Sequence, residues 1–168
     1  MTNDPLTDAE LRHVARAVDL AGEALAAGDE PFGSVLVDPG GQVLREARNL
    51  VRTTGDPTRH PEFELARWAA AHLDSGERAA CVVYTSGEHC PMCSAAHGWA
   101  GLGRIVYAHS SAELTRWLDE LGAAPGPVRP LDIRAVAPGV DVRGPVPAFT
   151  DRLRAMHREL RTRGADRT

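Results

Sequence analysis

The order of helical and strand-like segments predicts an α/β fold, a three-layer α-β-α sandwich around a five-stranded mixed sheet. A segment with helical periodicity comes first, two strand-like runs joined by a turn follow, and helices and strands then alternate. A helix between the fourth and fifth strands permits a right-handed crossover, so these two strands are expected to run parallel. With 168 residues, the chain fits one domain with a sizeable core.

The first part of the chain predicts one helix and one hairpin. Thr7 and Glu10 have the spacing of a capping box, and apolar residues then recur at helical spacing, so a helix is expected over residues 8–27. Residues 32–37 and 42–49 are two strand-like runs separated by an Asp-Pro-Gly-Gly turn, which indicates a β-hairpin.

Helices and strands alternate in the rest of the chain. In order, we expect a helix over 61–73, a strand over 80–86, a helix over 91–101, a strand over 104–108, a helix over 111–121, a strand over 131–136 and a last helical segment over about 146–163. On the helix that follows Cys90, Ala95, Ala96 and Trp99 are expected to face inward. A single domain is expected over residues 1–168, with its core at about 8–137.

Composition and charge exclude several classes of protein. Hydrophobic residues make up 43% of the chain and charged residues 25%, as in soluble globular proteins. No apolar run reaches about eighteen residues, and the first residues are neither basic nor apolar, so neither a membrane span nor a signal peptide is expected. The net charge of −4 offers no general attraction to nucleic acid. The cysteine usage indicates a reducing, cytoplasmic setting, with Cys81 as a small buried strand residue.

Two short motifs hold residues that can bind a metal ion. His60-Pro61-Glu62 supplies an imidazole and a carboxylate, and Cys90-Pro91-Met92-Cys93 supplies two thiols. With His60, Cys90 and Cys93 as ligands, the fourth tetrahedral position is left to water, as in catalytic rather than structural zinc sites. Glu62 follows two residues after the histidine, close enough to handle protons on that water.

Each motif has other interpretations when it stands alone. A Cys-x-x-Cys pair can be a redox dithiol or half of a structural zinc site. Here, however, both motifs come at the start of a predicted helix. Pro61 suits the first helical position and disfavours helical backbone angles at His60, as expected for the residue before a helix. This repeated placement favours a metal site, and His-x-Glu followed by Cys-x-x-Cys is typical of zinc-dependent base deaminases.

The sequence over about residues 8–137 resembles the cytidine/deoxycytidylate deaminase superfamily, most closely its guanine deaminase branch. Besides the two motifs, further short stretches carry the resemblance: Pro31-Phe32-Gly33, Asn49, Asp56-Pro57-Thr58, Thr85-Ser86, Trp99-Ala100 and Val106-Tyr107-Ala108. The resemblance implies a cytidine deaminase-like fold and a homodimer. It also implies Zn²⁺ as the cofactor, with His60, Cys90 and Cys93 as its ligands.

The resemblance also implies roles for three residues around the metal. Glu62 is expected to be the proton shuttle, Asn49 to hydrogen-bond the base, and Phe32 to contact the face of its ring. Without the family, Asn49 would be interpreted as a turn residue at the end of a strand, and Phe32 as a core residue.

Some residues depart from the family pattern or match it loosely. The family usually has Pro at the position of His89 and commonly has Ala at that of Pro61. His89 is expected to face solvent or to support the metal ligands without binding the metal itself. The alternatives are that it changes the stiffness of the loop before Cys90 or lines the pocket. His97 is expected to be packed or to support the site, with contact to the pocket as the alternative. Asp119 or Glu120 loosely matches an acidic residue that guanine deaminases draw from the region after the fourth strand.

The predicted function is the hydrolytic removal of an exocyclic amine from a free nucleobase of the guanine type, with release of ammonia. The alternatives are a cytosine, pyrimidine or nucleoside deaminase and, less favoured, a tRNA adenosine deaminase. From Thr150 onward the chain has six Arg against three acidic residues, which suits RNA contact but equally a solvated helix face in a chain without Lys. A zinc-stabilised binding module is the non-enzymatic alternative, although a purely structural site does not need Glu62.

Overall fold

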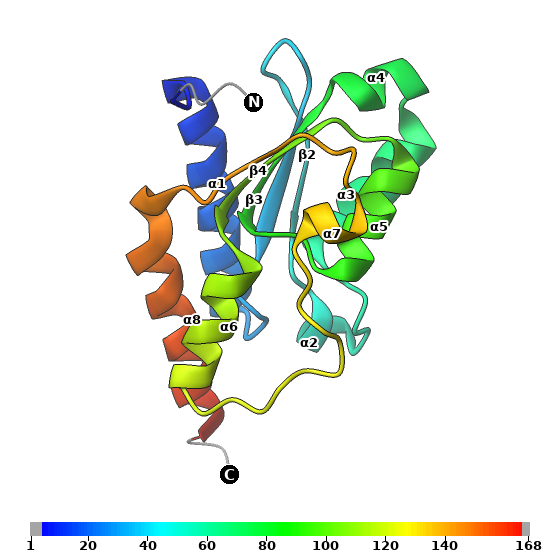
Figure 1. The fold of residues 1–168 in the computed structure, drawn as a ribbon. Helices are drawn as coiled ribbons and strands as arrows, with labels where there is room; N and C mark the ends of the chain where they lie inside the picture. The colour runs from blue at the N-terminus through cyan, green and yellow to red at the C-terminus, as the bar shows by residue number, and fades with distance from the viewer. Residues whose placement is uncertain (1–4, 166–168) are drawn as a thin grey trace.

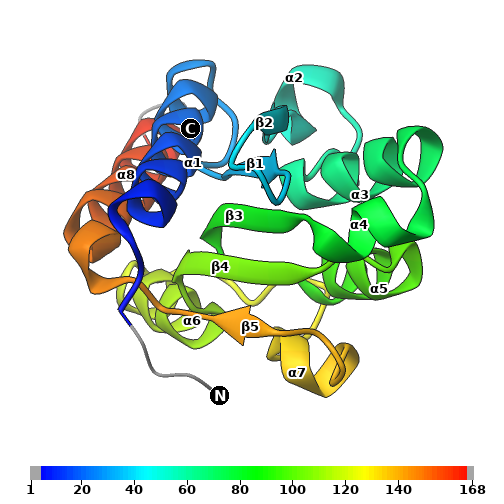
Figure 2. The same cartoon turned by 90° about the horizontal axis from the view of Figure 1, so that it is seen from above.

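The computed structural model describes residues 5–165, which form a sheet covered by helices on both faces (Figures 1 and 2). Within these residues the strands lie in the order β2-β1-β3-β4-β5. The strands are β1 (Gly33–Val37), β2 (Val43–Arg48), β3 (Val82–Gly87), β4 (Arg104–His109) and β5 (Val142–Arg143). On one face lie the helices α1 (Asp8–Ala26), α6 (Ser111–Glu120) and α8 (Thr150–Ala165), and on the other lie α3 (Pro61–His72), α5 (Pro91–Ala100) and α7 (Ile133–Val136). The predicted three-layer sandwich is confirmed.

Strand pairing follows the predicted topology. β1 pairs antiparallel with β2 in the expected hairpin and antiparallel with β3, whereas β3 with β4 and β4 with β5 run parallel. Successive side chains of a strand point to opposite faces of the sheet. Val35 and Val106 therefore pack in the layer of α1 and α8, while Leu36 and Ile105 pack in the layer of α3, α5 and α7.

The prediction of the fifth strand at residues 131–136 is wrong. That segment forms the short helix α7, and the edge strand is β5, which lies in the Pro/Gly-rich stretch that follows. The Asp132 side chain accepts a hydrogen bond from Arg134 N, and the buried Glu88 carboxylate accepts one from Ile133 N at 3.0 Å. A short apolar run does not distinguish a strand from a helical turn, and these carboxylates favour the turn.

The inward face predicted for α5 is wrong at Trp99, whose side chain is 89% exposed. The buried residues of α5 are Cys93, Ser94 and His97. The side chains of Cys93 and His97 lie one turn apart on the face that packs on α3 and the sheet, which leaves Trp99 on the outer side. The size and apolar character of Trp99 suggested burial, but the burial of Cys93 and His97 decides which face of α5 points inward.

Besides α7, two further short helices lie where the sequence predicts no helix. α2 (Val51–Thr54) lies between the strand expected over 42–49 and the helix expected over 61–73. α4 (Ser75–Ala80) follows α3, so β3 begins two residues later than expected. The last helical segment starts as a 3-10 turn, Pro147–Phe149, and continues as α8. Leu153 of α8 is fully buried against the layer of α1, so the C-terminal helix belongs to the same core. Among residues 5–165, every helix is too short or too polar to cross a membrane.

The start of β1 approaches α1 very closely at Gly33. A methyl group at this position would lie 2.4 Å from the Cβ atom of Leu20 and 2.5 Å from the carbonyl oxygen of Ala17. The backbone of α1 occupies the space of a side chain here, and Gly is therefore required by this contact.

We expect Gly33→Ala to lower the free energy of unfolding by about 1–3 kcal/mol, because α1 must move away from the sheet to admit the methyl group. Chemical denaturation measures the difference. Gly126→Ala is the matched control, since nothing lies within 4 Å of the equivalent methyl position there. Equal stability of the two variants would contradict this account of β1.

Candidate metal centre

The two predicted motifs occupy equivalent positions at the starts of neighbouring helices. His60 directly precedes α3 and Cys90 directly precedes α5; both have extended backbone angles, and each is followed by Pro in the first turn. α3 and α5 pack against each other on one face of the sheet (Figure 1). Their N-termini therefore converge, and the partial positive charge of these helix ends favours thiolates.

The three predicted ligands have the spacing that a tetrahedral metal ion requires. Cys90 Sγ lies 3.5 Å from Cys93 Sγ, and His60 Nδ1 lies 3.6 Å and 3.7 Å from these two sulfurs. Zinc bonds of about 2.3 Å to sulfur and about 2.0 Å to nitrogen place ligand atoms about 3.6–3.8 Å apart across a tetrahedron. His60 and Cys90 are half-buried and Cys93 is buried. The group therefore fits a zinc ion with three protein ligands.

Hydrogen bonding within the group favours a thiolate at Cys90. The hydrogen bond between Cys90 and Cys93 is the largest contribution and lowers the pKa of Cys90 to about 4, although burial opposes it. The same bond, together with burial, raises the pKa of Cys93. The hydrogen bond with Cys90 raises the pKa of His60. A thiolate and an imidazole at this spacing are a soft donor set that suits zinc.

Glu62 lies in the first turn of α3, buried behind the three ligands. Its Oε2 atom is 3.7 Å from Cys93 Sγ, and its Oε1 atom accepts a hydrogen bond of 3.0 Å from Thr85 on β3. Thr85 in turn accepts a hydrogen bond of 2.9 Å from Ser34 on β1. Burial raises the pKa of Glu62, while the charge of His60 and the bond from Thr85 act in the opposite direction. The carboxyl group is thus held rigidly beside the metal group and protonates more readily than an ordinary Glu.

Phe32 directly precedes β1 and Asn49 directly follows β2, so both lie at the same end of the β1–β2 hairpin. The β1–β2 hairpin is extended by a 2.9 Å bond from Asn49 N to Phe32 O, and β1–β3 pairing places this end beside the end of β3. Asn49 is fully buried, and its Nδ2 atom has no hydrogen-bond partner in residues 5–165. Most buried polar groups in folded proteins have a hydrogen-bond partner, so this unpaired donor is available to a bound molecule or to water. The half-buried ring of Phe32 contacts His157 edge-on, with ring centroids 5.2 Å apart.

The two histidines beside the cysteine motif are buried. His89 has no solvent-exposed surface, so the expectation that it faces solvent is wrong; its ring meets that of His97 edge-on, with centroids 5.2 Å apart. His97 is packed as expected, with Nε2 2.9 Å from the carbonyl oxygen of Gly103. Asp119 and Glu120 are exposed at the end of α6, and Glu120 forms an ion pair with Arg154.

Three buried residues near these groups were not predicted as functional. Thr85 supports Glu62, as described above. His109, at the end of β4, and His157, on α8, surround Phe32, and each has an Nε2 atom without a partner in the described chain. Burial lowers the pKa of His109 to about 4 and that of His157 to about 3, so both are neutral near pH 7. No motif marks these histidines, because β4 and α8 meet only in the folded chain.

A model of the cytidine and deoxycytidylate deaminase zinc-binding region matches residues 7–109. The chain belongs to this family. The matched region contains the His60, Cys90 and Cys93 group, and the cofactor of this protein is therefore Zn²⁺.

Similarity to individual proteins supports the same assignment. A guanine deaminase of Bacillus subtilis is 43% identical over 94 residues, which cover 55% of this chain and 60% of that protein. A probable cytosine deaminase of Schizosaccharomyces pombe is 30% identical over 125 residues, which cover 74% of this chain and 75% of that protein. A third relative, a tRNA(Ile)-lysidine synthase of Deinococcus deserti, is matched over only 18% of its own length.

The solved structure of the guanine deaminase from Nitrosomonas europaea has the same fold. It superposes with a TM-score of 0.70 at 25% identity, over 95% of this chain and 89% of that chain. The cytidine deaminase-like fold is therefore confirmed over almost the whole length of this chain, including the C-terminal part beyond residue 137, where the sequence resemblance fades.

We expect Cys90→Ala and Cys93→Ala each to lose zinc and to lower the melting temperature, because a metal that joins two helices contributes its binding energy to folding. Metal analysis and thermal unfolding measure both effects. Cys81→Ala is the matched control, since Cys81 is a buried thiol outside the metal group. Stoichiometric zinc in either of the first two variants would show that the cysteine concerned is not a ligand.

Proposed function

We propose that this deaminase hydrolyses the exocyclic C–N bond of a free nucleobase of the guanine type and releases ammonia. His60, Cys90 and Cys93 hold the zinc ion in this proposal, and Glu62 carries protons. The observation that supports it most strongly is the position of Glu62, whose carboxylate is buried 3.7 Å from Cys93 Sγ and fixed by Thr85. A purely structural metal site, or a zinc-stabilised binding module, needs no such carboxylate.

The chemistry follows from the roles of these groups. When bound, Zn²⁺ supplies the Lewis acidity that makes water a nucleophile near neutral pH. Glu62 accepts a proton from the water, whose oxygen adds to the ring carbon that bears the amine. Glu62 then gives this proton to the adjacent ring nitrogen, and afterwards moves the remaining proton of the added hydroxyl group to the amine. Ammonia leaves, and a carbonyl remains on the ring.

Asn49 and Phe32 are the residues proposed to bind the base. The free Nδ2 atom of Asn49 can donate to a ring nitrogen or a carbonyl oxygen, and the ring of Phe32 can cover one face of the base. The guanine preference is supported by the similarity to the guanine deaminases of Bacillus subtilis and Nitrosomonas europaea. A role in purine salvage would follow from that substrate.

Two alternatives within the family remain to be tested against this choice. The Schizosaccharomyces pombe relative favours cytosine as the alternative base. A tRNA substrate is less well supported, because three arginines of α8 are already in ion pairs: Arg152 with Asp19, Arg154 with Glu120, and Arg163 with Glu159. The homodimer and the cytoplasmic location stay predictions.

We expect Glu62→Gln to lower turnover by about 10²–10⁴-fold while zinc content stays stoichiometric, because the carboxylate moves protons and does not hold the metal. Ammonia release and metal analysis measure the two effects on the same sample. Glu64→Gln is the matched control on the same helix, since Glu64 faces Arg59 and Arg67 instead. Loss of zinc in Glu62→Gln, or activity near that of the unchanged protein, would contradict the assigned role.

We expect guanine to have the highest kcat/KM when ammonia release is compared for guanine, cytosine, adenine, their nucleosides and tRNA. A pocket that relies on a buried donor discriminates strongly against ligands that leave the donor unpaired. A clear preference for cytosine, a nucleoside or tRNA would overturn the proposed substrate while leaving the zinc deaminase assignment intact.

A further inference from the structure

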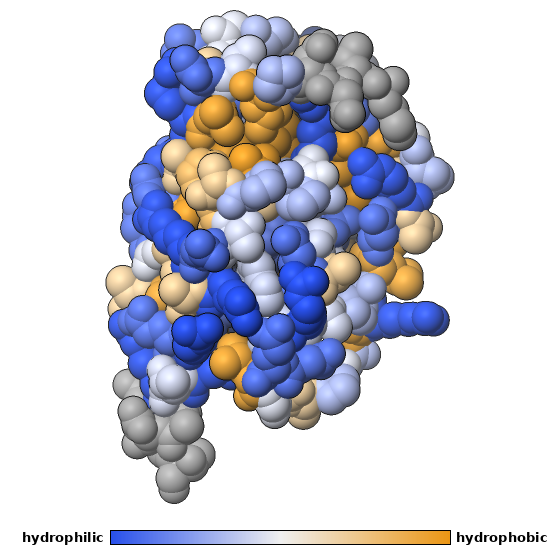
Figure 3. All heavy atoms as spheres, turned by 60° about the vertical axis from the view of Figure 1, so that its left-hand side comes forward, coloured by the Kyte–Doolittle hydropathy of each residue, from blue (hydrophilic) through white to orange (hydrophobic). Residues whose placement is uncertain are grey.

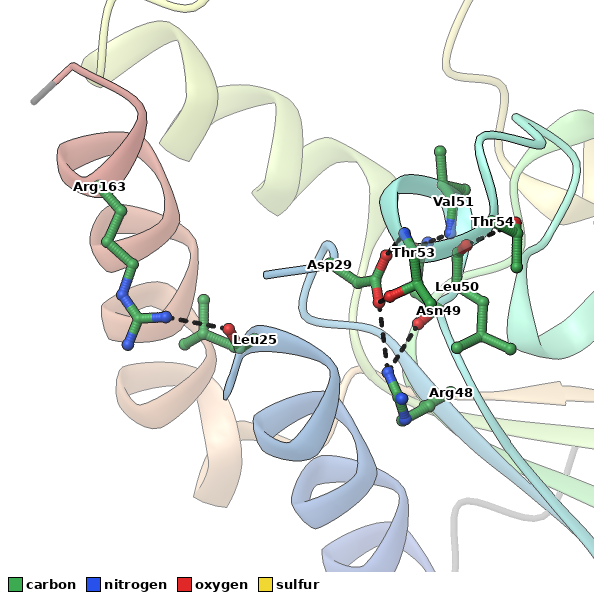
Figure 4. A network of polar contacts seen from close by, with 9 residues as sticks. All are labelled: Leu25, Asp29, Arg48, Asn49, Leu50, Val51, Thr53, Thr54 and Arg163. Atoms are coloured by element: carbon green, nitrogen blue, oxygen red, sulfur yellow. Dashed lines mark hydrogen bonds and ion pairs between the residues drawn. The ribbon is translucent and has the colours of Figure 1, made fainter. Parts of the chain in front are cut away.

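Asp29 is a fully buried carboxylate in the turn between α1 and β1, outside the zinc motifs. Its Oδ1 atom accepts a 2.8 Å hydrogen bond from Thr53 N, and its Oδ2 atom accepts a 2.5 Å bond from Thr53 Oγ1 (Figure 4). Arg48 adds an ion pair to Oδ2 at 3.3 Å. Burial alone raises the pKa of Asp29, but these bonds outweigh it and lower the pKa. The carboxylate is therefore charged near pH 7, and both of its oxygen atoms accept hydrogen bonds.

The turn that carries Asp29 is itself anchored. Asp29 N donates to the carbonyl oxygen of Ala24 at 2.9 Å, which ties the turn to the end of α1. From α8, Arg163 donates to the carbonyl oxygen of Leu25 at 3.0 Å (Figure 4). Asp29 thus projects from a fixed part of the molecule toward the segment that follows β2.

That segment is α2, which has little stability of its own. It is four residues long, none of its residues is buried, and Leu50 before it makes no side-chain capping bond. A single helical turn is not stable in isolation, because its few hydrogen bonds do not offset the entropy lost on ordering it. Two bonds from Thr53 to Asp29, together with a 3.1 Å bond from Leu50 N to the carbonyl oxygen of Arg59, tie α2 to the rest of the molecule.

α2 contacts the side chain of Asn49 directly. Val51 N, the first backbone amide of α2, donates to Asn49 Oδ1 at 3.0 Å. With Oδ1 held by α2, Nδ2 points the other way and is the buried donor without a partner. Arg48 joins the same network, since its Nη1 atom contacts both Asp29 Oδ2 and the carbonyl oxygen of Asn49, the latter at 3.4 Å.

We propose that Asp29 is a positioning residue for substrate recognition: by binding Thr53 it fixes α2, and through Val51 it orients the Asn49 amide toward the base. The inference rests on the proposed function, in which Asn49 Nδ2 donates to an acceptor on the ring edge. Asp29 touches neither the base nor the metal group. Its loss therefore changes base binding without changing the zinc content.

The test uses Thr53 first, because its side chain is exposed and its truncation leaves the core intact. Thr53→Ala removes the side-chain bond to Asp29, whereas Thr53→Ser keeps the hydroxyl. We expect Thr53→Ala to raise KM for the base about tenfold with kcat within about threefold, in proportion to one lost hydrogen bond to a charged group. Thr53→Ser is expected to behave as the unchanged protein. Asp29→Asn, with a larger rise in KM, is the second variant.

Thr115→Ala is the control for loss of a threonine hydroxyl elsewhere, because Thr115 Oγ1 donates to the carbonyl oxygen of Ser111 on α6, at 2.9 Å. Hydrogen exchange at the Val51 amide provides a readout that does not need turnover. We expect exchange at Val51 to accelerate at least about tenfold in Thr53→Ala and Asp29→Asn, but not in Thr53→Ser or Thr115→Ala. Zinc content is expected to be the same in all of these variants.

Unchanged Val51 exchange in both Thr53→Ala and Asp29→Asn would overturn the inference, as would an unchanged KM in both. An equal rise in KM in Thr115→Ala would also overturn it, since the effect would then be general loss of stability. If the unchanged protein deaminates no base, the proposed function fails, and exchange at Val51 alone decides whether Asp29 holds Asn49.

Discussion

The structure depends on one constraint, the meeting of three ligand atoms from two helix starts within the distances that a zinc ion accepts. His60 and Cys90 each precede a helix, so α3 and α5 must pack with their N-termini together. Cys93, one turn into α5, then fixes the rotation of that helix about its axis. His97 follows it inward, and Trp99 is left outside.

Two buried carboxylates show how the surroundings of a side chain decide its chemistry. Glu62 receives one hydrogen bond from Thr85 and has its pKa raised by burial, which suits a group that exchanges protons. Asp29 receives two bonds from Thr53 and an ion pair with Arg48, so its pKa is lowered and it stays charged. A charged carboxylate with all these partners suits a fixed structural support rather than proton transfer.

The C-terminal helix contacts both α1 and the start of β1. Leu153 packs with α1, and Arg163 donates a hydrogen bond to the carbonyl oxygen of Leu25 in that helix. His157 lies against Phe32, one of the two residues proposed to bind the base. Hydrophilic and hydrophobic side chains are mixed on this face of the molecule (Figure 3). Ion pairs join α8 to its two neighbours, Arg152 with Asp19 of α1 and Arg154 with Glu120 of α6.

The sequence by itself determined the layers of the fold and the zinc motifs, because helical and strand periodicities and the spacing of His60, Glu62, Cys90 and Cys93 are local properties. It did not determine the fifth strand, since residues 131–136 are a short apolar run that either structure can use, and Glu88 and Asp132 decide for a helix. Only the tertiary structure brought Asp29 to Thr53, Thr85 to Glu62, and His109 and His157 to Phe32. These contacts join residues 23 to 125 positions apart, and no pattern along the chain records which distant polar groups will share one buried environment.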